Sequence, residues 1–253
     1  MDLYTQKLGT GEPVVILHGF MGTSDNWYGI AKKIAENNTV YVVDLRNHGR
    51  SPHSDEFDYN VMAEDVHEVI QKHNIDNPIL MGHSMGGKVL MHYSRLFPDQ
   101  FKKLIIVDIA PKAYPVHHQK ILDGLLSINL NTLKSRTEAD KILSLYVPEP
   151  SIRMFLLKNL DRDGQGFTWK ANLPVLNKNI KEVGKETFQE NTSQKPVIFI
   201  RGANSPYIKS EDRPQIKKMY PHASIVSIKD SGHWLHAEQP EAFLKVAGHI
   251  ISS

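Results

Sequence analysis

A serine between two glycines is the strongest chemical signal in the sequence, in the segment Gly-His-Ser-Met-Gly at residues 82–86. An apolar run at residues 79–81 precedes it and a helical pattern follows it, so the pattern predicts a strand, a sharp turn and a helix in direct succession. Such a turn has room only for small residues at Gly82 and Gly86, and it projects the Ser84 hydroxyl above the sheet at a helix N-terminus. Because a helix N-terminus favours the negative charge that develops in acyl transfer, we expect Ser84 to be a nucleophile.

A chance loop, a nucleotide-binding loop and an aspartate-nucleophile site all fit this segment less well. A loop that holds glycine and serine by chance needs no strand before it and no helix after it. The Gly-x-Gly-x-x-Gly pattern of dinucleotide-binding loops is absent, and Lys88 is followed by Val89 rather than by serine or threonine, so the sequence has no phosphate-binding loop here. Serine at the turn also disfavours chemistry that uses an aspartate nucleophile.

A serine hydroxyl needs a base within hydrogen-bond reach. In proteins with a Gly-x-Ser-x-Gly motif of this kind the order along the chain is serine, acid, histidine, which requires a late histidine. His233 is the predicted base because Gly232 permits a tight loop after the apolar run at residues 225–228. His236 is the near competitor, but a helix is expected to start there. Most of the 13 histidines are expected to be ordinary surface or core residues.

Short apolar runs and helical patterns alternate along the chain. Continuous apolar runs indicate strands buried on both faces of a parallel sheet, and these occur at residues 14–17, 40–43, 79–81, 104–107, 197–200 and 225–228. Helical patterns lie at residues 25–36, 60–73, 85–97 and 241–251. With residues 3–8 as an antiparallel edge strand, the alternation predicts an α/β fold: a mostly parallel, doubly wound sheet of about seven strands with helices on both faces.

This alternation stops between Pro111 and about Gln194. No strand is expected there, and helical spacing relates the apolar residues Ile121, Leu122, Leu125, Leu126 and Ile128, then Ile142, Leu143 and Tyr146, then Phe155, Leu156 and Leu160. Helix packing explains most of them. Insertions at the carboxyl ends of parallel strands also build ligand sites, so we expect a core domain at residues 1–110 and 195–253 and an inserted helical cap at residues 111–194.

Four motifs in order resemble those of the α/β-hydrolase superfamily along nearly the full chain. They are His18-Gly19-Phe20, Asp44-Leu45-Arg46-Asn47-His48-Gly49-Arg50-Ser51, the segment at residues 82–86, and Ser231-Gly232-His233-Trp234. Within the superfamily, the segments at residues 107–111 and 201–207 are similar to small bacterial esterases of the YbfF type, which are related to mitochondrial abhydrolase-11-like proteins. The resemblance implies an α/β-hydrolase fold and a serine-dependent hydrolase.

The acid departs from the commonest pattern of that superfamily. The usual position, after the strand at residues 197–200, holds Asn204 or Ser205, and neither stabilises an imidazolium as a carboxylate does. Asp108 follows the buried strand at residues 104–107, next to the strand that precedes Ser84. Some members of the superfamily place their acid there, so Asp108 is the predicted acid. Asp212 and Glu211 are fallbacks several residues too far along, and an Asp108 that only caps the turn before Pro111 is the structural alternative.

The oxyanion of a tetrahedral intermediate needs preorganised donors. In the elbow geometry the backbone N–H groups of Met85 and Phe20 supply them. His18 and His83 flank the site and are expected to brace loops by hydrogen bonds. Trp169 and Tyr207, with Phe20 and Met85, are candidates to line an apolar acyl pocket, although aromatic residues are more often core.

Composition excludes several other classes. The 30 Lys+Arg against 28 Asp+Glu give a net charge of +2, so no nucleic-acid partner is indicated. The absence of Cys excludes disulfides, cysteine-bound zinc and a thiol nucleophile. No apolar run approaches the roughly 18 residues that cross a bilayer and the N-terminus carries no signal pattern, so no membrane partner and a cytoplasmic location are expected. Asp44, Asn47 and His48 could suggest a metal, but a glycine-rich turn explains them better, and no metal or cofactor is expected.

We therefore predict a carboxylesterase that cleaves short to medium acyl esters through an acyl-enzyme. An acyl-CoA thioesterase is the alternative. Cations of the insertion could meet a CoA phosphate or could equally be solvated, and they include Lys134, Arg136, Arg153 and Lys158. A carbon–carbon bond hydrolase and a ligand receptor without turnover stay possible on the same scaffold. The expected partner is a small-molecule acyl ester or thioester, and the sequence carries no signal for oligomeric state.

Overall fold

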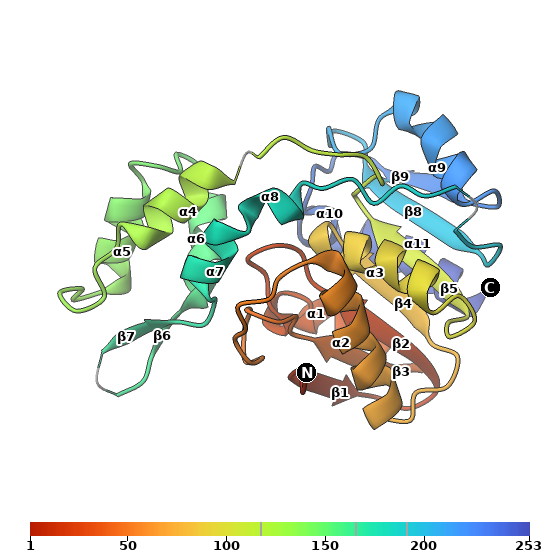
Figure 1. The fold of residues 1–253 in the computed structure, drawn as a ribbon, viewed down its shortest axis with the longest axis horizontal. Helices are drawn as coiled ribbons and strands as arrows, with labels where there is room; N and C mark the ends of the chain where they lie inside the picture. Colours follow the sequence, from red (N-terminus) through yellow and green to blue (C-terminus); the bar gives the residue numbers. More distant parts are fainter. Residues whose placement is uncertain (117, 165, 191) are drawn as a thin grey trace.

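A seven-stranded sheet forms the centre of the molecule in the computed structural model, which describes residues 1–116, 118–164, 166–190 and 192–253 (Figure 1). The strand order is β1-β3-β2-β4-β5-β8-β9, and every pair is parallel except β1 with β3. The strands are β1 (Thr5–Leu8), β2 (Glu12–Leu17), β3 (Asn38–Val43), β4 (Ile79–His83), β5 (Lys103–Val107), β8 (Val197–Gly202) and β9 (Ser224–Ile228). The predicted α/β sheet with an antiparallel edge strand is confirmed.

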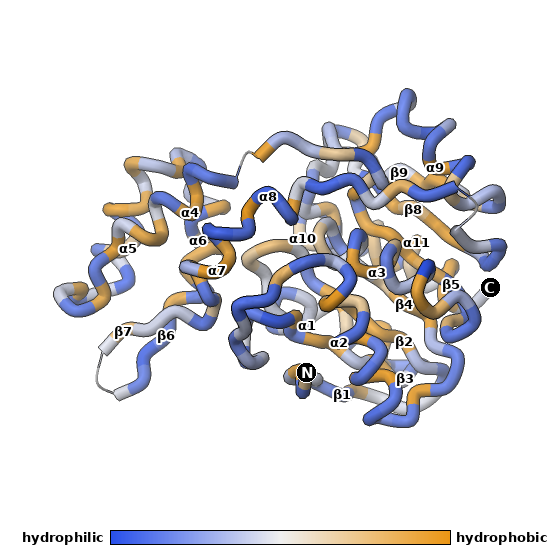
Figure 2. Tube along the Cα trace, viewed as in Figure 1, coloured by the Kyte–Doolittle hydropathy of each residue, from blue (hydrophilic) through white to orange (hydrophobic). Residues whose placement is uncertain are grey.

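Helices cover both faces of this sheet because its strands alternate two sets of apolar side chains. In β2, Val15 and Leu17 belong to the apolar cluster that also contains residues of α2 (Tyr59–Lys72), α3 (Met85–Leu96) and α9 (Arg213–Met219). Val14 and Ile16 belong to the cluster that contains residues of α1 (Tyr28–Ile34) and α11 (Pro240–Ser252). Shorter helical turns are η1 (Ser24–Asn26), η3 (Ser210–Asp212) and α10 (Leu235–Glu238). Figure 2 shows the hydrophobic residues concentrated in the strands and in the helix faces that cover them. No helix in the described part of the chain is both long enough and apolar enough to traverse a bilayer.

The segment between β5 and β8 forms a separate group of helices beside the sheet (Figure 1). Its helices are α4 (Gln119–Leu126), α5 (Arg136–Leu143), α6 (Pro150–Leu156), η2 (Leu157–Asn159), α7 (Leu173–Lys178) and α8 (Ile180–Val183). Where we expected no strand, β6 (Leu160–Arg162) and β7 (Phe167–Trp169) form an antiparallel hairpin. The expectation was wrong because β6, Leu-Asp-Arg, is mostly hydrophilic (Figure 2), and because the hairpin depends on backbone pairing and on Arg162 stacking 4.6 Å from the ring centre of Phe167.

The two connections of this segment to the core lie against each other and against α3. The Tyr114 N–H donates to the Gly184 carbonyl at 2.8 Å. The ammonium of Lys88, in α3, donates to the Lys112 carbonyl at 3.1 Å and also to the Lys185 carbonyl. Lys88 is almost fully buried, which lowers the pKa of its ammonium to about 7. The helix that begins after Ser84 therefore holds the entry and the exit of the inserted segment.

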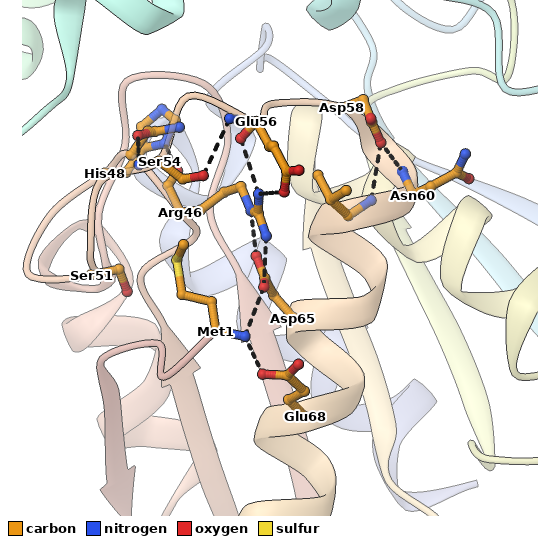
Figure 3. A network of polar contacts seen from close by, with 12 residues as sticks. Met1, Arg46, His48, Ser51, Ser54, Glu56, Asp58, Asn60, Asp65 and Glu68 are labelled. Atoms are coloured by element: carbon orange, nitrogen blue, oxygen red, sulfur yellow. Dashed lines mark hydrogen bonds and ion pairs between the residues drawn. The ribbon is translucent and has the colours of Figure 1, made fainter.

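Ion pairs and hydrogen bonds hold the loop after β3 in place (Figure 3). Arg46 forms a bidentate pair with Asp65 of α2, at 2.5 and 2.9 Å, and also donates to the Glu56 carbonyl at 3.0 Å. The Asp44 carboxylate accepts the N–H groups of Ser24 at 2.5 Å and Arg50 at 2.8 Å. These contacts give the loop a structural role and hold it against Ser24, in the segment that follows β2.

Candidate active site

Ser84 lies at a strained turn between β4 and α3. Its φ of 49° and ψ of −114° are rare for any residue with a side chain. A Cβ at Gly82 would lie 2.4 Å from the Gly86 carbonyl oxygen, and a Cβ at Gly86 would lie 2.6 Å from the His18 carbonyl oxygen. The backbone therefore passes too close to itself for any residue but glycine on either side of the serine. This is the geometry of a nucleophile elbow.

A continuous hydrogen-bond chain links three of the predicted residues. The Nε2 atom of His233 lies 3.1 Å from the Ser84 hydroxyl oxygen, and its Nδ1 atom lies 2.8 Å from Oδ2 of Asp108. The carboxylate of Asp108 fixes the tautomer that carries a proton on Nδ1, so Nε2 is free to accept the serine proton. The structure thus brings together a serine, an imidazole and a carboxylate from the ends of β4, β9 and β5.

Asp108 is held by more than the histidine. It continues β5 in the left-handed region, with a φ of 52°, and its Oδ1 accepts the Gly202 N–H at 3.1 Å. The Ser205 hydroxyl donates to the same Oδ2 that binds His233. The pKa of Asp108 is raised to about 7. Burial is the largest cause and raises it, whereas the hydrogen bonds from Ser205 and Gly202 act to lower it. Ser205 was missed as a functional residue, although it stands where the related superfamily usually has its acid.

The competing candidates have other contacts. Asp212 pairs with Lys112, with both carboxylate oxygens 2.8 Å from the ammonium. Glu211 is exposed and lies 3.8 Å from the Lys209 ammonium. His236 stacks on Trp27 at a ring separation of 4.2 Å. None of these three contacts involves Ser84 or His233.

The histidines beside the nucleophile brace loops. His18 accepts the Leu45 N–H on Nε2 at 3.0 Å, and its Nδ1 donates to the Gly19 carbonyl at 2.8 Å. His83 Nε2 donates to the carbonyl of His233 at 2.8 Å, which ties the base loop to the nucleophile strand. Burial lowers the pKa of both side chains, so both stay neutral near pH 7.

A cavity of about 250 Å³ opens beside Ser84. Core residues line one side of it and the inserted segment lines the other, through Phe20, Trp27, Tyr207, Trp234, Ile121, Ile152, Phe155 and Leu156. Tyr207 also stacks on His233, with ring centres 3.8 Å apart. Met85 begins α3, where amides have no partner within the helix, and it lines a smaller space on the other side of Ser84.

The side chains do not support two of the substrate contacts considered from the sequence. Trp169 does not line the cavity, because it belongs to β7 and is half-buried against the core. Of the cations considered for a CoA phosphate, Arg136 donates to the Leu160 carbonyl at 2.6 Å and Arg153 pairs with Asp140 at 2.8 Å. Lys134 and Lys158 are exposed. Nothing in these contacts forms a phosphate site.

Proteins of known family are similar to this chain over nearly its whole length. A family model described as the alpha/beta hydrolase fold matches residues 12–240. The chain is 35% identical over 260 residues to sn-1-specific diacylglycerol lipase ABHD11 of Xenopus laevis, covering 100% of this chain and 83% of that protein. It is 34% identical over 242 residues to Esterase YbfF of Escherichia coli (strain K12), covering 95% and 93%. A solved structure titled "Marine microorganism esterase" has a TM-score of 0.95 and 40% identity, and the match covers 98% of each chain.

The elbow predicts opposite effects for two glycine substitutions. Gly82→Ala forces a methyl group against backbone and should lower the free energy of unfolding by about 3 kcal/mol or more. Gly248→Ala is the matched control, because Gly248 lies in α11 with no atom within 4 Å of a new Cβ, and it should stabilise by about 0.5–1 kcal/mol. Urea unfolding followed by circular dichroism measures both, and similar midpoints for the two variants would contradict this account of the elbow.

Proposed function

Because the chain belongs to the α/β-hydrolase fold family, we propose that Ser84, His233 and Asp108 are its catalytic triad, acting on short to medium acyl esters. The chain is an ester hydrolase, similar in sequence and structure to enzymes named esterase or lipase. The observation that carries the proposal is the hydrogen-bond chain from the Ser84 hydroxyl through His233 to the Asp108 carboxylate.

In this mechanism, the Ser84 oxygen attacks the ester carbonyl while Nε2 of His233 removes the proton of the serine hydroxyl. Asp108 orients the imidazole and stabilises its positive charge. The backbone N–H groups of Phe20 and Met85 hold the oxyanion. The same imidazole returns the proton to the departing alcohol, and water then attacks the acyl-enzyme with His233 as base.

The inserted segment at residues 111–194 acts in this proposal as a cap that shapes the substrate cavity. The side chains Ile121, Ile152 and Phe155 line that cavity from α4 and α6. Their apolar surface suits the hydrocarbon part of an acyl ester rather than a charged group. The contacts of Arg136 and Arg153 favour an ester over an acyl-CoA thioester as the substrate.

The first prediction concerns turnover by wild type and Ser84→Ala on p-nitrophenyl esters from acetate to palmitate, beside matching acyl-CoAs. We expect hydrolysis of the short and medium esters, and we expect Ser84→Ala to lower kcat by about 10⁴-fold or more because alanine has no hydroxyl to attack the ester. Full activity in Ser84→Ala would show that Ser84 is not the nucleophile. Faster turnover of acyl-CoAs than of esters would reassign the substrate class, and binding without turnover would indicate a receptor.

The second prediction separates the acid from its fallback. Asp108→Asn should lower kcat by about 10³- to 10⁴-fold, since an amide cannot stabilise the imidazolium or hold its tautomer. Glu211→Gln is the control and should retain wild-type kcat, because that carboxylate is exposed and lies against Lys209. Circular dichroism checks that both variants are folded. A reversed order of the two activities would transfer the role of acid to the later residue.

The third prediction concerns pH. Turnover needs an ionised Asp108 and a neutral His233, and the pKa of Asp108 is raised to about 7 by burial. The value of kcat/KM should therefore fall as pH drops below about 7, approaching tenfold per pH unit, with an apparent pKa that belongs to the Asp108–His233 pair. Ser205→Ala removes a hydrogen bond that lowers the pKa of Asp108. In this variant the acidic limb of the kcat/KM profile should therefore move to higher pH. A limb that moves to lower pH in this variant would contradict the assignment.

A further inference from the structure

The polar side chains around the substrate cavity are mostly committed to other groups. Asn26 uses its side-chain oxygen to accept the Thr23 N–H at 2.8 Å. His18 uses both ring nitrogens within its own loops, and His83 donates to the His233 carbonyl. His236 also lines this cavity, but neither of its ring nitrogens is hydrogen-bonded to another described residue.

His236 is held in place without using its nitrogens. It lies in α10, is 6% exposed, and stacks on Trp27 with the rings inclined by only 8°. Its ring also meets His83 edge to face, with centres 4.8 Å apart. No hydrogen bond joins either nitrogen to another described residue, and Nδ1 is buried with no partner.

A buried ring nitrogen without a partner is costly, and most such groups in proteins have one. Other buried unpartnered histidine nitrogens among the described residues belong to His48, His67 and His92, and none of these side chains lines the cavity. His236 does line the cavity, and because its Nδ1 is enclosed by protein, Nε2 is the nitrogen that a bound substrate could reach; no hydrogen bond to a described residue occupies it. Burial, with a smaller contribution from His83 and His233, lowers the pKa of His236 well below 6.5, so the ring is neutral and offers one donor and one acceptor.

We propose that His236 is a specificity-determining residue that hydrogen-bonds an uncharged oxygen, a hydroxyl or a carbonyl, in the non-reacting part of the substrate. This inference rests on the proposed function, since it places the oxygen-bearing part of an ester in the cavity beside Ser84. The surrounding apolar side chains bind the hydrocarbon, and the imidazole distinguishes oxygenated esters from plain ones. The oxygen can belong to the acyl part or to the alcohol part, and the test separates the two.

The test compares two pairs of esters that differ by hydroxyl groups. The acyl pair is p-nitrophenyl 3-hydroxybutyrate and p-nitrophenyl butyrate, and the alcohol pair is glycerol 1-butyrate and propyl butyrate. For each pair the measured quantity is the ratio of kcat/KM for the hydroxylated ester to that for the plain ester. In His236→Phe, which keeps an aromatic ring against Trp27, this ratio should fall about tenfold in one of the pairs, because the ester hydroxyl loses its partner.

Two further variants make the result specific. His236→Gln keeps a donor and an acceptor and should restore part of the ratio, whereas Phe155→Leu changes only apolar lining and should leave the ratio as in wild type. Unchanged ratios in both pairs for folded His236→Phe would overturn the proposal. So would an equal fall in Phe155→Leu, which would show that cavity shape is responsible.

A measurement without substitution at His236 keeps the proposal testable if those variants do not fold. The side-chain ¹⁵N signals of His236 are followed in Ser84→Ala protein while glycerol 1-butyrate or p-nitrophenyl 3-hydroxybutyrate is added. Movement of these signals with a hydroxylated ester, and not with its plain counterpart, supports the proposal, and equal or absent movement overturns it. The loss of turnover in Ser84→Ala tests the catalytic proposal separately.

Discussion

The parallel register of β4, β5 and β8 controls the whole site. The N–H of Ser84 continues the β4 ladder and donates to the Val107 carbonyl at 2.9 Å, and the N–H of Asp108 continues the β5 ladder and donates to the Ile200 carbonyl at 2.8 Å. Ser84 and Asp108 are thus the next residues of two hydrogen-bonded strands, and their separation follows from the register of the sheet. A histidine loop that follows β9 needs only to reach across this edge, and the hydrogen bond from His83 to the His233 carbonyl holds it there. Parallel strands place their carboxyl ends together, which is why the chemistry gathers at this edge.

The Asp108 carboxylate is shared between groups from two strand ends. It lies at the end of β5, and its Oδ2 accepts hydrogen bonds both from Nδ1–H of His233 and from the hydroxyl of Ser205, which follows β8. The site after β8 therefore contributes to orientation although it carries no charge. Burial and hydrogen bonding act in opposite directions on the pKa of Asp108, so the surroundings of this carboxylate set the pH range in which it is ionised.

The sequence was most informative where a pattern has one physical cause. Buried parallel strands must be apolar, and a turn in which an added Cβ would lie 2.4 Å from a backbone oxygen must contain glycine, so both the sheet and the elbow could be predicted. The place of Asp108 at the end of a buried strand could also be predicted, and the structure puts its carboxylate 2.8 Å from Nδ1 of His233. The β6–β7 hairpin could not, because backbone pairing leaves little trace in a hydrophilic sequence, and Trp169 was given a pocket role that its position in the hairpin does not support. The state of the His236 nitrogens depends on neighbours far apart in sequence, so only the structure reveals it.

The paired connections of the inserted segment have a consequence for how such proteins diversify. The segment leaves and re-enters the core at points joined by the hydrogen bond from Tyr114 to Gly184. Lys88 anchors both of these connections to α3. Because the two ends of the segment are held together, a change in its length costs the fold of the sheet little. Residues can therefore be gained, lost or replaced within the segment while the strand register, and with it the arrangement of Ser84, Asp108 and His233, is preserved.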